Sequence, residues 1–157
     1  MTLRDYTELV ADGRGSFTYY KRSPDDLMCI YRAMRGQWLH GLPRDSVYLV
    51  VIDSFRLREQ DSITKDETEP GNTPDKFQKY LDLLESRNGM APAWWDRASR
   101  STCVARAMQK KSQPNIHSTL SQKDILDFYR DPVMPTKLRA LAAKVYGWEF
   151  EARGVFE

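Results

Sequence analysis

Asp53 is the one acidic residue within an otherwise apolar segment, which makes it the first candidate for chemistry in this sequence. Arg56 follows at a spacing of three, which places the two side chains on the same side of a helix. A carboxyl group in apolar surroundings has a shifted pKa and is suited to general acid or base catalysis. The favoured interpretation is a partly buried ion pair that fixes helix packing. Asp53 and Arg56 are therefore weak catalytic candidates, and the question of enzymatic activity stays open.

A second candidate site combines aromatic and basic residues. Trp94 and Trp95 are adjacent, and Arg97 and Arg100 follow them. Adjacent side chains on a helix point about 100° apart, so we expect one ring in the core and the other at the rim of a groove. Core packing is the commoner role for such rings, but a rim tryptophan beside arginines is typical of a binding surface. The predicted binding residues are these four.

Several classes of chemistry lack the residues that they require. His40 and His117 are the only histidines, and neither has a metal-ligating partner at a suitable spacing. Cys29 and Cys103 are isolated within apolar patterns, which indicates buried free thiols. The sequence also has no phosphate-binding glycine loop and no nucleophile elbow. We therefore predict no metal and no cofactor.

Composition and charge narrow the function further. The chain has 157 residues, of which 41% are hydrophobic, a balance typical of one globular domain. Its 24 basic and 22 acidic residues give a net charge of +2, so nucleic acid is a disfavoured partner despite the basic cluster in segment 97–111. No apolar run has the length of a membrane span or a signal peptide. These features predict a soluble protein of the cytoplasm or nucleus, with no membrane partner.

The elements that must position these residues are predicted to be helices. Apolar residues at helical spacing, together with capping signals such as Ser23-Pro24 and Thr73-Pro74, define them. The predicted helical segments are 2–13, 23–41, 46–58, 73–88, 94–111, 121–130 and 135–147. Residues 16–20 are expected to form an extended connector.

Segment 47–58 is the most ambiguous element, because its β-branched residues also suit a buried strand. Its length and the capping residues ahead of it favour a helix. We expect residues 60–72 to form a flexible internal loop and residues 148–157 a C-terminal tail. The predicted architecture is a single helical domain over residues 1–157, an all-α, irregular, compact bundle of about six helices.

Several short stretches resemble a known family. They are Val51 to Arg58, Phe77 with Tyr80-Leu81, Pro92 to Trp95, Cys103, Leu138 to Ala142, and Val145 to Gly147. Over about residues 27–147 this pattern is similar to the helical region that follows the zinc finger in small fungal proteins of the MYND type. The finger itself has no counterpart in this sequence. The resemblance implies a helical fold and an intracellular fungal setting, and it implies neither zinc nor a catalytic activity.

Two functions follow as competing predictions. The first is a non-enzymatic, intracellular protein-interaction or regulatory domain that binds a protein partner through an aromatic and basic surface near Trp94–Arg100. The alternative is a small cofactor-independent enzyme of the isomerase or cyclase type. It would use Asp53 as acid or base in an apolar pocket lined by Tyr48, Phe55 and a tryptophan. The sequence defines neither the partner or substrate nor the oligomeric state.

Overall fold

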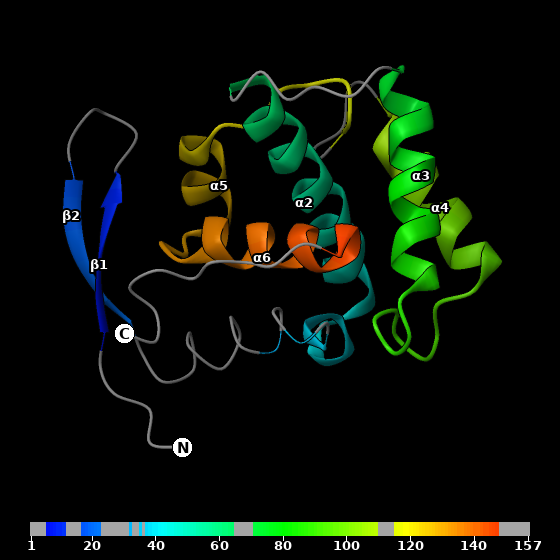
Figure 1. The fold of residues 1–157 in the computed structure, drawn as a ribbon, viewed down its shortest axis with the longest axis horizontal. Coiled ribbons are helices and arrows are strands. Elements are labelled where there is room, and N and C mark those ends of the chain that lie inside the picture. Colours follow the sequence, from blue (N-terminus) through cyan, green and yellow to red (C-terminus); the bar gives the residue numbers. More distant parts are fainter. Residues whose placement is uncertain are drawn as a thin grey trace.

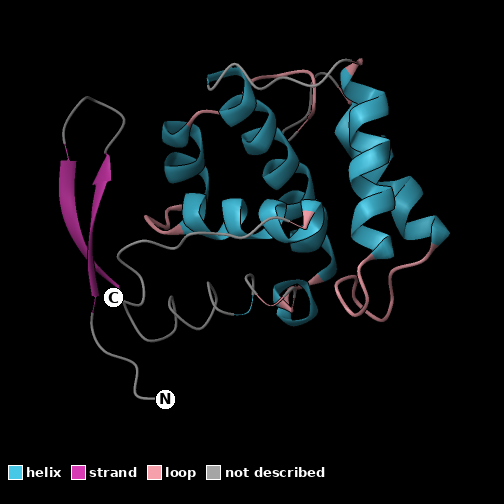
Figure 2. Ribbon diagram, viewed as in Figure 1, coloured by secondary structure: helices cyan, strands magenta, loops and turns pink. Residues whose placement is uncertain are grey.

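The helical part of the molecule is built from five α-helices and one short 3-10 helix among the described residues. The structure is a computed structural model. It describes the backbone of residues 6–11 and 17–22, and it also describes residues 32, 35, 37–64, 71–109 and 115–147. The helices are η1 (Trp38–Gly41), α2 (Arg44–Thr64), α3 (Thr73–Ser86), α4 (Arg97–Met108), α5 (Gln122–Tyr129) and α6 (Met134–Tyr146). Helices dominate this part of the chain, as Figure 2 shows. The predicted all-α, irregular and compact bundle is confirmed.

The start of the chain differs from the prediction. Strands β1 (Tyr6–Ala11) and β2 (Phe17–Arg22) form an antiparallel hairpin in which Tyr6 lies opposite Arg22 and Ala11 lies opposite Phe17. A helix over 2–13 is therefore wrong for its described residues, and the extended connector at 16–20 is one strand of a pair. Both strands are rich in β-branched and aromatic residues, and the intervening sequence is rich in residues that form turns. Strand propensity therefore outweighs the apparent helical spacing here.

Two further predictions lie largely or wholly outside the described residues. Of the predicted helix 23–41, Arg32 is helical and residues 38–41 form η1. The predicted tail, 148–157, lies outside the described part entirely. No helix of the described residues is both long and apolar enough to cross a membrane.

Helix α2 lies at the centre of the fold, and its helical assignment decides the ambiguity of segment 47–58. Figure 1 shows α6 running across it, between α5 and α3. Every side chain from Val50 to Leu57 is buried, so residues on all sides of this part of the helix contact protein. A helix buried on all sides has no polar face, which explains why this segment also suited a central strand.

The predicted loop at 60–72 begins later than expected, because α2 continues to Thr64. Its last turns are held by ion pairs. Asp61 receives two hydrogen bonds from Arg139 of α6, at 2.9 and 3.2 Å, and Lys76 of α3 lies 3.4 Å from Glu59. These tertiary contacts extend the helix through a polar sequence, so residues 60–64 are not loop. Residues 65–70 lie outside the described part.

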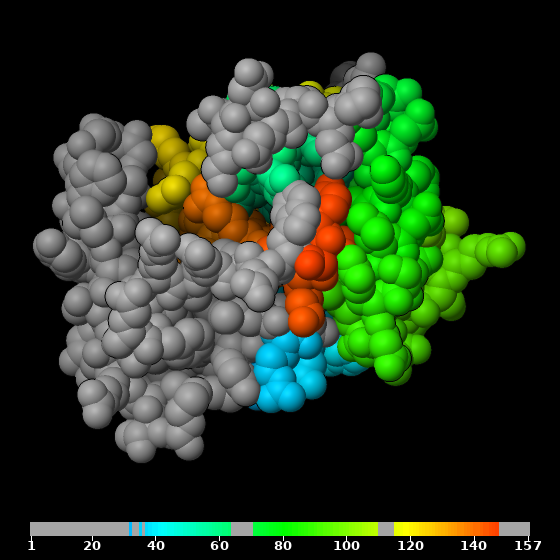
Figure 3. Space-filling view, viewed as in Figure 1, coloured from blue at the N-terminus to red at the C-terminus, as the bar shows by residue number. Residues whose placement is uncertain are grey.

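The core joins α2, α3 and α6 through aromatic rings. Phe55 packs against Phe77 and Tyr80, with ring centroids 5.1 and 5.5 Å apart. Tyr80 also contacts Tyr146 of α6 at 5.5 Å, and its hydroxyl forms a 2.7 Å hydrogen bond with the Ser54 hydroxyl. Figure 3 shows α3 and α6 side by side on one face of the molecule. This core fixes α3 relative to α2 and so fixes one wall of the candidate site.

Side-chain caps define where the helices start. Asn72 accepts a hydrogen bond from the backbone of Asp75 at the start of α3, and Ser121 and Asp124 form a capping box on α5. Asp96 caps α4 by accepting from the backbone of Ser99 at 2.7 Å. Because that cap begins α4 at Arg97, the helix starts three residues later than the predicted segment 94–111. Both tryptophans therefore precede it.

We expect Gly147→Ala to lower the free energy of unfolding by about 1–2 kcal/mol. Gly147 ends α6 with φ +80, and an added Cβ would lie 2.7 Å from Nη2 of Arg87. The Arg87 Nε in turn donates to the Val145 carbonyl at 3.0 Å, so its side chain is not free to move away. Urea unfolding measures the change. Gly41→Ala is the control, because its nearest new contact is at 4.0 Å, and an equal loss in both variants would contradict this account.

Candidate functional site

The turn between α3 and α4 brings both tryptophans onto α2. The backbone N–H of Trp95 donates to the Pro92 carbonyl at 2.9 Å, which closes the turn. Tyr48 of α2 lies 5.8 Å from the Trp94 ring, edge to face, and 6.1 Å from the Trp95 ring. Since neither tryptophan is on a helix, the expected divergence of about 100° does not apply. Both rings pack on the same tyrosine and both remain partly exposed.

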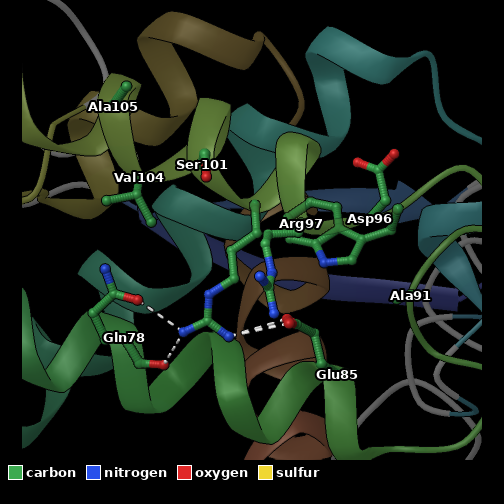
Figure 4. A pocket seen from close by; sticks show the side chains of 10 residues that line it. Gln78, Glu85, Ala91, Asp96, Arg97, Ser101, Val104 and Ala105 are labelled. Atoms are coloured by element: carbon green, nitrogen blue, oxygen red, sulfur yellow. Dashed lines mark hydrogen bonds and ion pairs between the residues drawn. The ribbon is translucent and has the colours of Figure 1, made fainter.

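A groove of about 810 Å³ lies between α3 and α4, and we call it the α3–α4 groove (Figure 4). Its lining residues are Gln78, Glu85, Ala91, Trp95, Asp96, Arg97, Arg100, Ser101, Val104 and Ala105. Three of the four predicted binding residues line it, and Trp94 lies outside its lining. The groove has polar walls and an apolar component from the tryptophan, the valine and the two alanines, a mixture typical of ligand-binding sites.

Arg100 holds the two helices together. Its guanidinium donates to both carboxylate oxygens of Glu85 at 3.0 Å and lies 2.7 Å from the carboxylate of Asp82. It also donates to the backbone and side-chain oxygens of Gln78, at 3.1 and 2.8 Å (Figure 4). Its charge is therefore neutralised within the protein. Arg100, one of the predicted binding residues, thus lines the groove and bridges α4 to α3.

Arg97 is the basic residue of the groove that remains available. Its side chain is exposed and makes no hydrogen bond or ion pair with the part of the chain that the structure describes. The adjacent Asp96 is occupied by capping α4, and the backbone hydrogen bond from Ser99 lowers its pKa. Nearby, the guanidinium of Arg44 lies 4.6 Å above the ring of Trp94. The groove thus combines the ring of Trp95 and the exposed charge of Arg97 with the carboxylate of Asp96, and Arg44 and Trp94 lie outside its lining.

The indole N–H of Trp95 is buried and has no hydrogen-bond acceptor among the residues that the structure describes. A buried donor without an acceptor costs about 1–3 kcal/mol. The residue nevertheless lines the groove. This unsatisfied N–H makes Trp95 a candidate hydrogen-bond donor to a bound molecule.

Asp53 and Arg56 are both buried, with 3% and 6% of their surface exposed, and they form an ion pair at 2.8 Å. The other carboxylate oxygen of Asp53 accepts a hydrogen bond from the Tyr129 hydroxyl at 2.5 Å. Burial raises the pKa of Asp53, and the contacts with Tyr129 and Arg56 offset this only partly. Burial beside this carboxylate also raises the pKa of the Tyr129 hydroxyl.

The surroundings of Asp53 differ from the predicted apolar pocket. Tyr48 contacts the tryptophans and Phe55 lies in the core, so neither lines a pocket at Asp53. A cavity of about 400 Å³ opens there instead, and we call it the Asp53 cavity. Its lining residues are Asp53, Arg56, Thr119, Leu120, Asp124, Ile125, Asp127, Phe128 and Tyr129. Sequence reasoning missed Tyr129, because 76 positions separate it from Asp53 and no pattern links the two.

The histidines have structural positions or lie at the surface. The His40 ring nitrogen Nε2 forms a hydrogen bond of 2.5 Å with the Gly89 carbonyl, which joins η1 to the turn after α3. His117 is exposed. Among the described residues, no group of three or more histidine, cysteine or acidic side chains is arranged to hold a metal ion.

Cys103 is expected to resist thiol reagents as long as the protein is folded. It is fully buried in α4, and burial raises the pKa of its thiol to about 12, so the reactive thiolate is scarce near neutral pH. Alkylation with iodoacetamide at pH 8, followed by mass spectrometry of the Cys103 peptide, tests this. Labelling should appear only in denaturant, and rapid labelling of the native protein would contradict the burial. The other predicted buried thiol, Cys29, lies outside the described residues.

Comparisons with known proteins add no relative. No family model, no curated protein and no solved structure matches this chain. The fold and the groove define the class on their own: a small, irregular helical bundle with a groove between two of its helices. The resemblance to the helical region of MYND-type proteins stays a prediction.

Proposed function

We propose that this protein is a non-enzymatic interaction or regulatory domain, and that the α3–α4 groove binds a segment of a protein partner. The observation that carries the proposal is the groove itself, because it is lined by Trp95 and Arg97, two residues suited to binding. Tryptophan and arginine are the residues most often found at binding hot spots. An intracellular setting, in the cytoplasm or nucleus, is part of the same proposal.

The chemistry of the lining indicates what the partner presents. Trp95, Val104 and the neighbouring alanines favour an apolar side chain. Arg97 adds an exposed positive charge, whereas the charge of Arg100 is already neutralised by Glu85 and Asp82. The complementary segment therefore carries an apolar anchor followed by an acidic residue. A carbonyl on the same segment would satisfy the indole N–H of Trp95.

Adjacent positions on α4 allow a matched test. Ser101 lines the groove, whereas Thr102 is exposed on the same helix and lies outside the lining. The tagged chain is purified from its native cells as wild type, Ser101→Trp and Thr102→Trp. We expect a stoichiometric partner with wild type and Thr102→Trp and its loss with Ser101→Trp, because the new ring fills the groove without removing any native contact.

Charge reversal gives a second comparison. Arg97→Glu should weaken partner binding at least tenfold, whereas Lys79→Glu, an exposed change outside the groove, should leave it unchanged. Circular dichroism confirms that each variant is folded. A partner that binds all four variants equally would rule out the groove as its site.

A small cofactor-independent enzyme remains the second candidate, favoured by one observation: the buried Asp53 lines a cavity and contacts the Tyr129 hydroxyl. Asp53 would act as acid or base at a bound substrate. Its test is turnover of metabolites by the purified chain, which Asp53→Asn should abolish while the fold is retained. Equal loss of folding and activity would favour the structural role of the ion pair.

A further inference from the structure

The Asp53 cavity is suited in size and lining to a small organic molecule. Its volume of about 400 Å³ lies within the usual range of ligand sites. Leu120 and Ile125 are apolar parts of the lining, and the ring of Phe128 is 58% exposed. Phe128 is one of two large hydrophobic side chains that are exposed in the described part of the chain. A large exposed ring on the lining of a cavity indicates that an apolar group packs there.

The inner polar groups have spare capacity to accept hydrogen bonds and little to donate. Four of the five N–H groups of Arg56 donate hydrogen bonds. Their acceptors are Asp53, two oxygens of Ser118 and the Thr119 carbonyl. Tyr129 donates its hydroxyl proton to Asp53, which leaves the phenol oxygen as an acceptor. From the described residues each carboxylate oxygen of Asp53 accepts one hydrogen bond, and a carboxylate oxygen can accept two. The cavity therefore favours a ligand that donates.

The charges of the lining favour a cation. Arg56 neutralises Asp53 within the cavity wall, whereas Asp124 and Asp127 add two further carboxylates. Lys123 lies 2.7 Å from Asp127 and balances one of them. Among these described residues, one negative charge therefore remains in excess. The exposed ring of Phe128 adds an apolar surface beside this charge.

We propose that the Asp53 cavity binds a small primary amine with an apolar body. The ammonium group donates to the oxygens of Asp53 and Tyr129, and the apolar body packs against Phe128 and Leu120. This site is separate from the α3–α4 groove, and the inference does not rest on the function proposed for that groove or on catalysis. The proposal names a class of ligand for the Asp53 cavity, which is not part of the groove proposed to bind the partner.

Benzylamine is the probe, with benzyl alcohol and benzoate as neutral and anionic compounds of similar shape. Binding to the intact chain is followed by two-dimensional NMR in low salt at pH 7. We expect benzylamine to shift the resonances of α5 and of residues 118–120, benzyl alcohol to bind about tenfold more weakly, and benzoate not to bind. Equal binding of the amine and the alcohol, or no binding of the amine at a concentration of about 10 mM, would overturn the proposal.

Variants at exposed positions avoid the risk of unfolding. Phe128→Ala, which removes apolar packing, and Asp127→Asn, which removes a negative charge, should each weaken benzylamine binding about threefold or more. The matched controls are Ile63→Ala, which removes the other exposed large hydrophobic side chain, and Asp45→Asn, which removes an exposed carboxylate outside the cavity. Binding that responds to the controls as strongly as to the cavity variants would overturn the site.

Two further measurements distinguish a free small amine from an amine on a partner protein, and the cavity from the groove. A capped lysine presents the same ammonium as a partner protein would, and tighter binding of it than of benzylamine would overturn the assignment to a free small molecule. Ser101→Trp should leave benzylamine binding unchanged, so failure of the groove proposal and failure of the cavity proposal are distinguishable.

Discussion

Replacing Asp53 by alanine is expected to lower the free energy of unfolding by about 3–5 kcal/mol, among the largest effects of any single substitution in the described chain. The variant leaves the buried guanidinium of Arg56 without its ion-pair partner. It also leaves the Tyr129 hydroxyl without the acceptor that joins α5 to α2. Urea unfolding followed by circular dichroism gives the value.

The control for this variant is Asp45→Ala. Asp45 forms a comparable contact, 3.1 Å from Arg106, but at an exposed position where an ion pair contributes about 0–1 kcal/mol. A small loss at Asp45 and a large one at Asp53 would establish burial as the cause. A loss below about 1 kcal/mol at both positions would mean that the buried pair does not hold α5 in place.

The cost of Asp53→Ala should also depend on pH. Because burial raises the folded-state pKa of Asp53 above its ordinary value of 3.8, the folded protein binds more protons there than the unfolded chain does. The contribution of Asp53 is therefore greatest below pH 3.8 and decreases as the pH rises through the folded-state pKa. The difference between wild type and variant should decrease in the same direction. A difference that grows with pH would show that Arg56 lowers the pKa instead.

Phe55→Ala should cost about 3–5 kcal/mol for a different reason. Phe55 is fully buried and its ring contacts Phe77 and Tyr80, so truncation leaves a void where α2 and α3 meet. Thermal and urea unfolding both report the loss. Because α3 forms one wall of the groove, the variant should also bind the groove partner more weakly.

Phe128→Ala provides the comparison within one residue type. Its ring is 58% exposed, so we expect a change in stability within about 0.5 kcal/mol. If the two phenylalanine variants lose equal stability, the core assigned here is wrong. If Phe55→Ala is mild, the neighbouring rings must close the void.

Local signals in the sequence predicted most of the helical body. The Thr73-Pro74 signal marked α3 within a residue, and the pairing of Ser121 with Asp124 anticipated the capping box of α5. Such signals act over one helical turn, so a single sequence is sufficient to detect them. The burial of Cys103 followed in the same way from its place in an apolar pattern.

Long-range contacts explain the remainder. The end of α2 is polar in sequence and helical in the structure because Arg139 and Lys76 reach it from other helices. Tyr129 joins Asp53 only through the packing of α5 against the rest of the bundle. The neutralisation of Arg100 by α3 also had no local signal, so its charge was counted toward a binding surface. In each case the decisive partner is distant in sequence.

The bridge made by Arg100 affects how the α3–α4 groove would bind a partner. One guanidinium contacts Gln78 and Glu85 of α3, as Figure 4 shows, and also Asp82, so the spacing between the two walls is set before a partner arrives. A preorganised wall spacing spares the protein the loss of conformational entropy that an adaptable surface incurs on association. For the partner segment proposed above, the ordering cost would then fall on that segment, and its width and shape would determine selectivity.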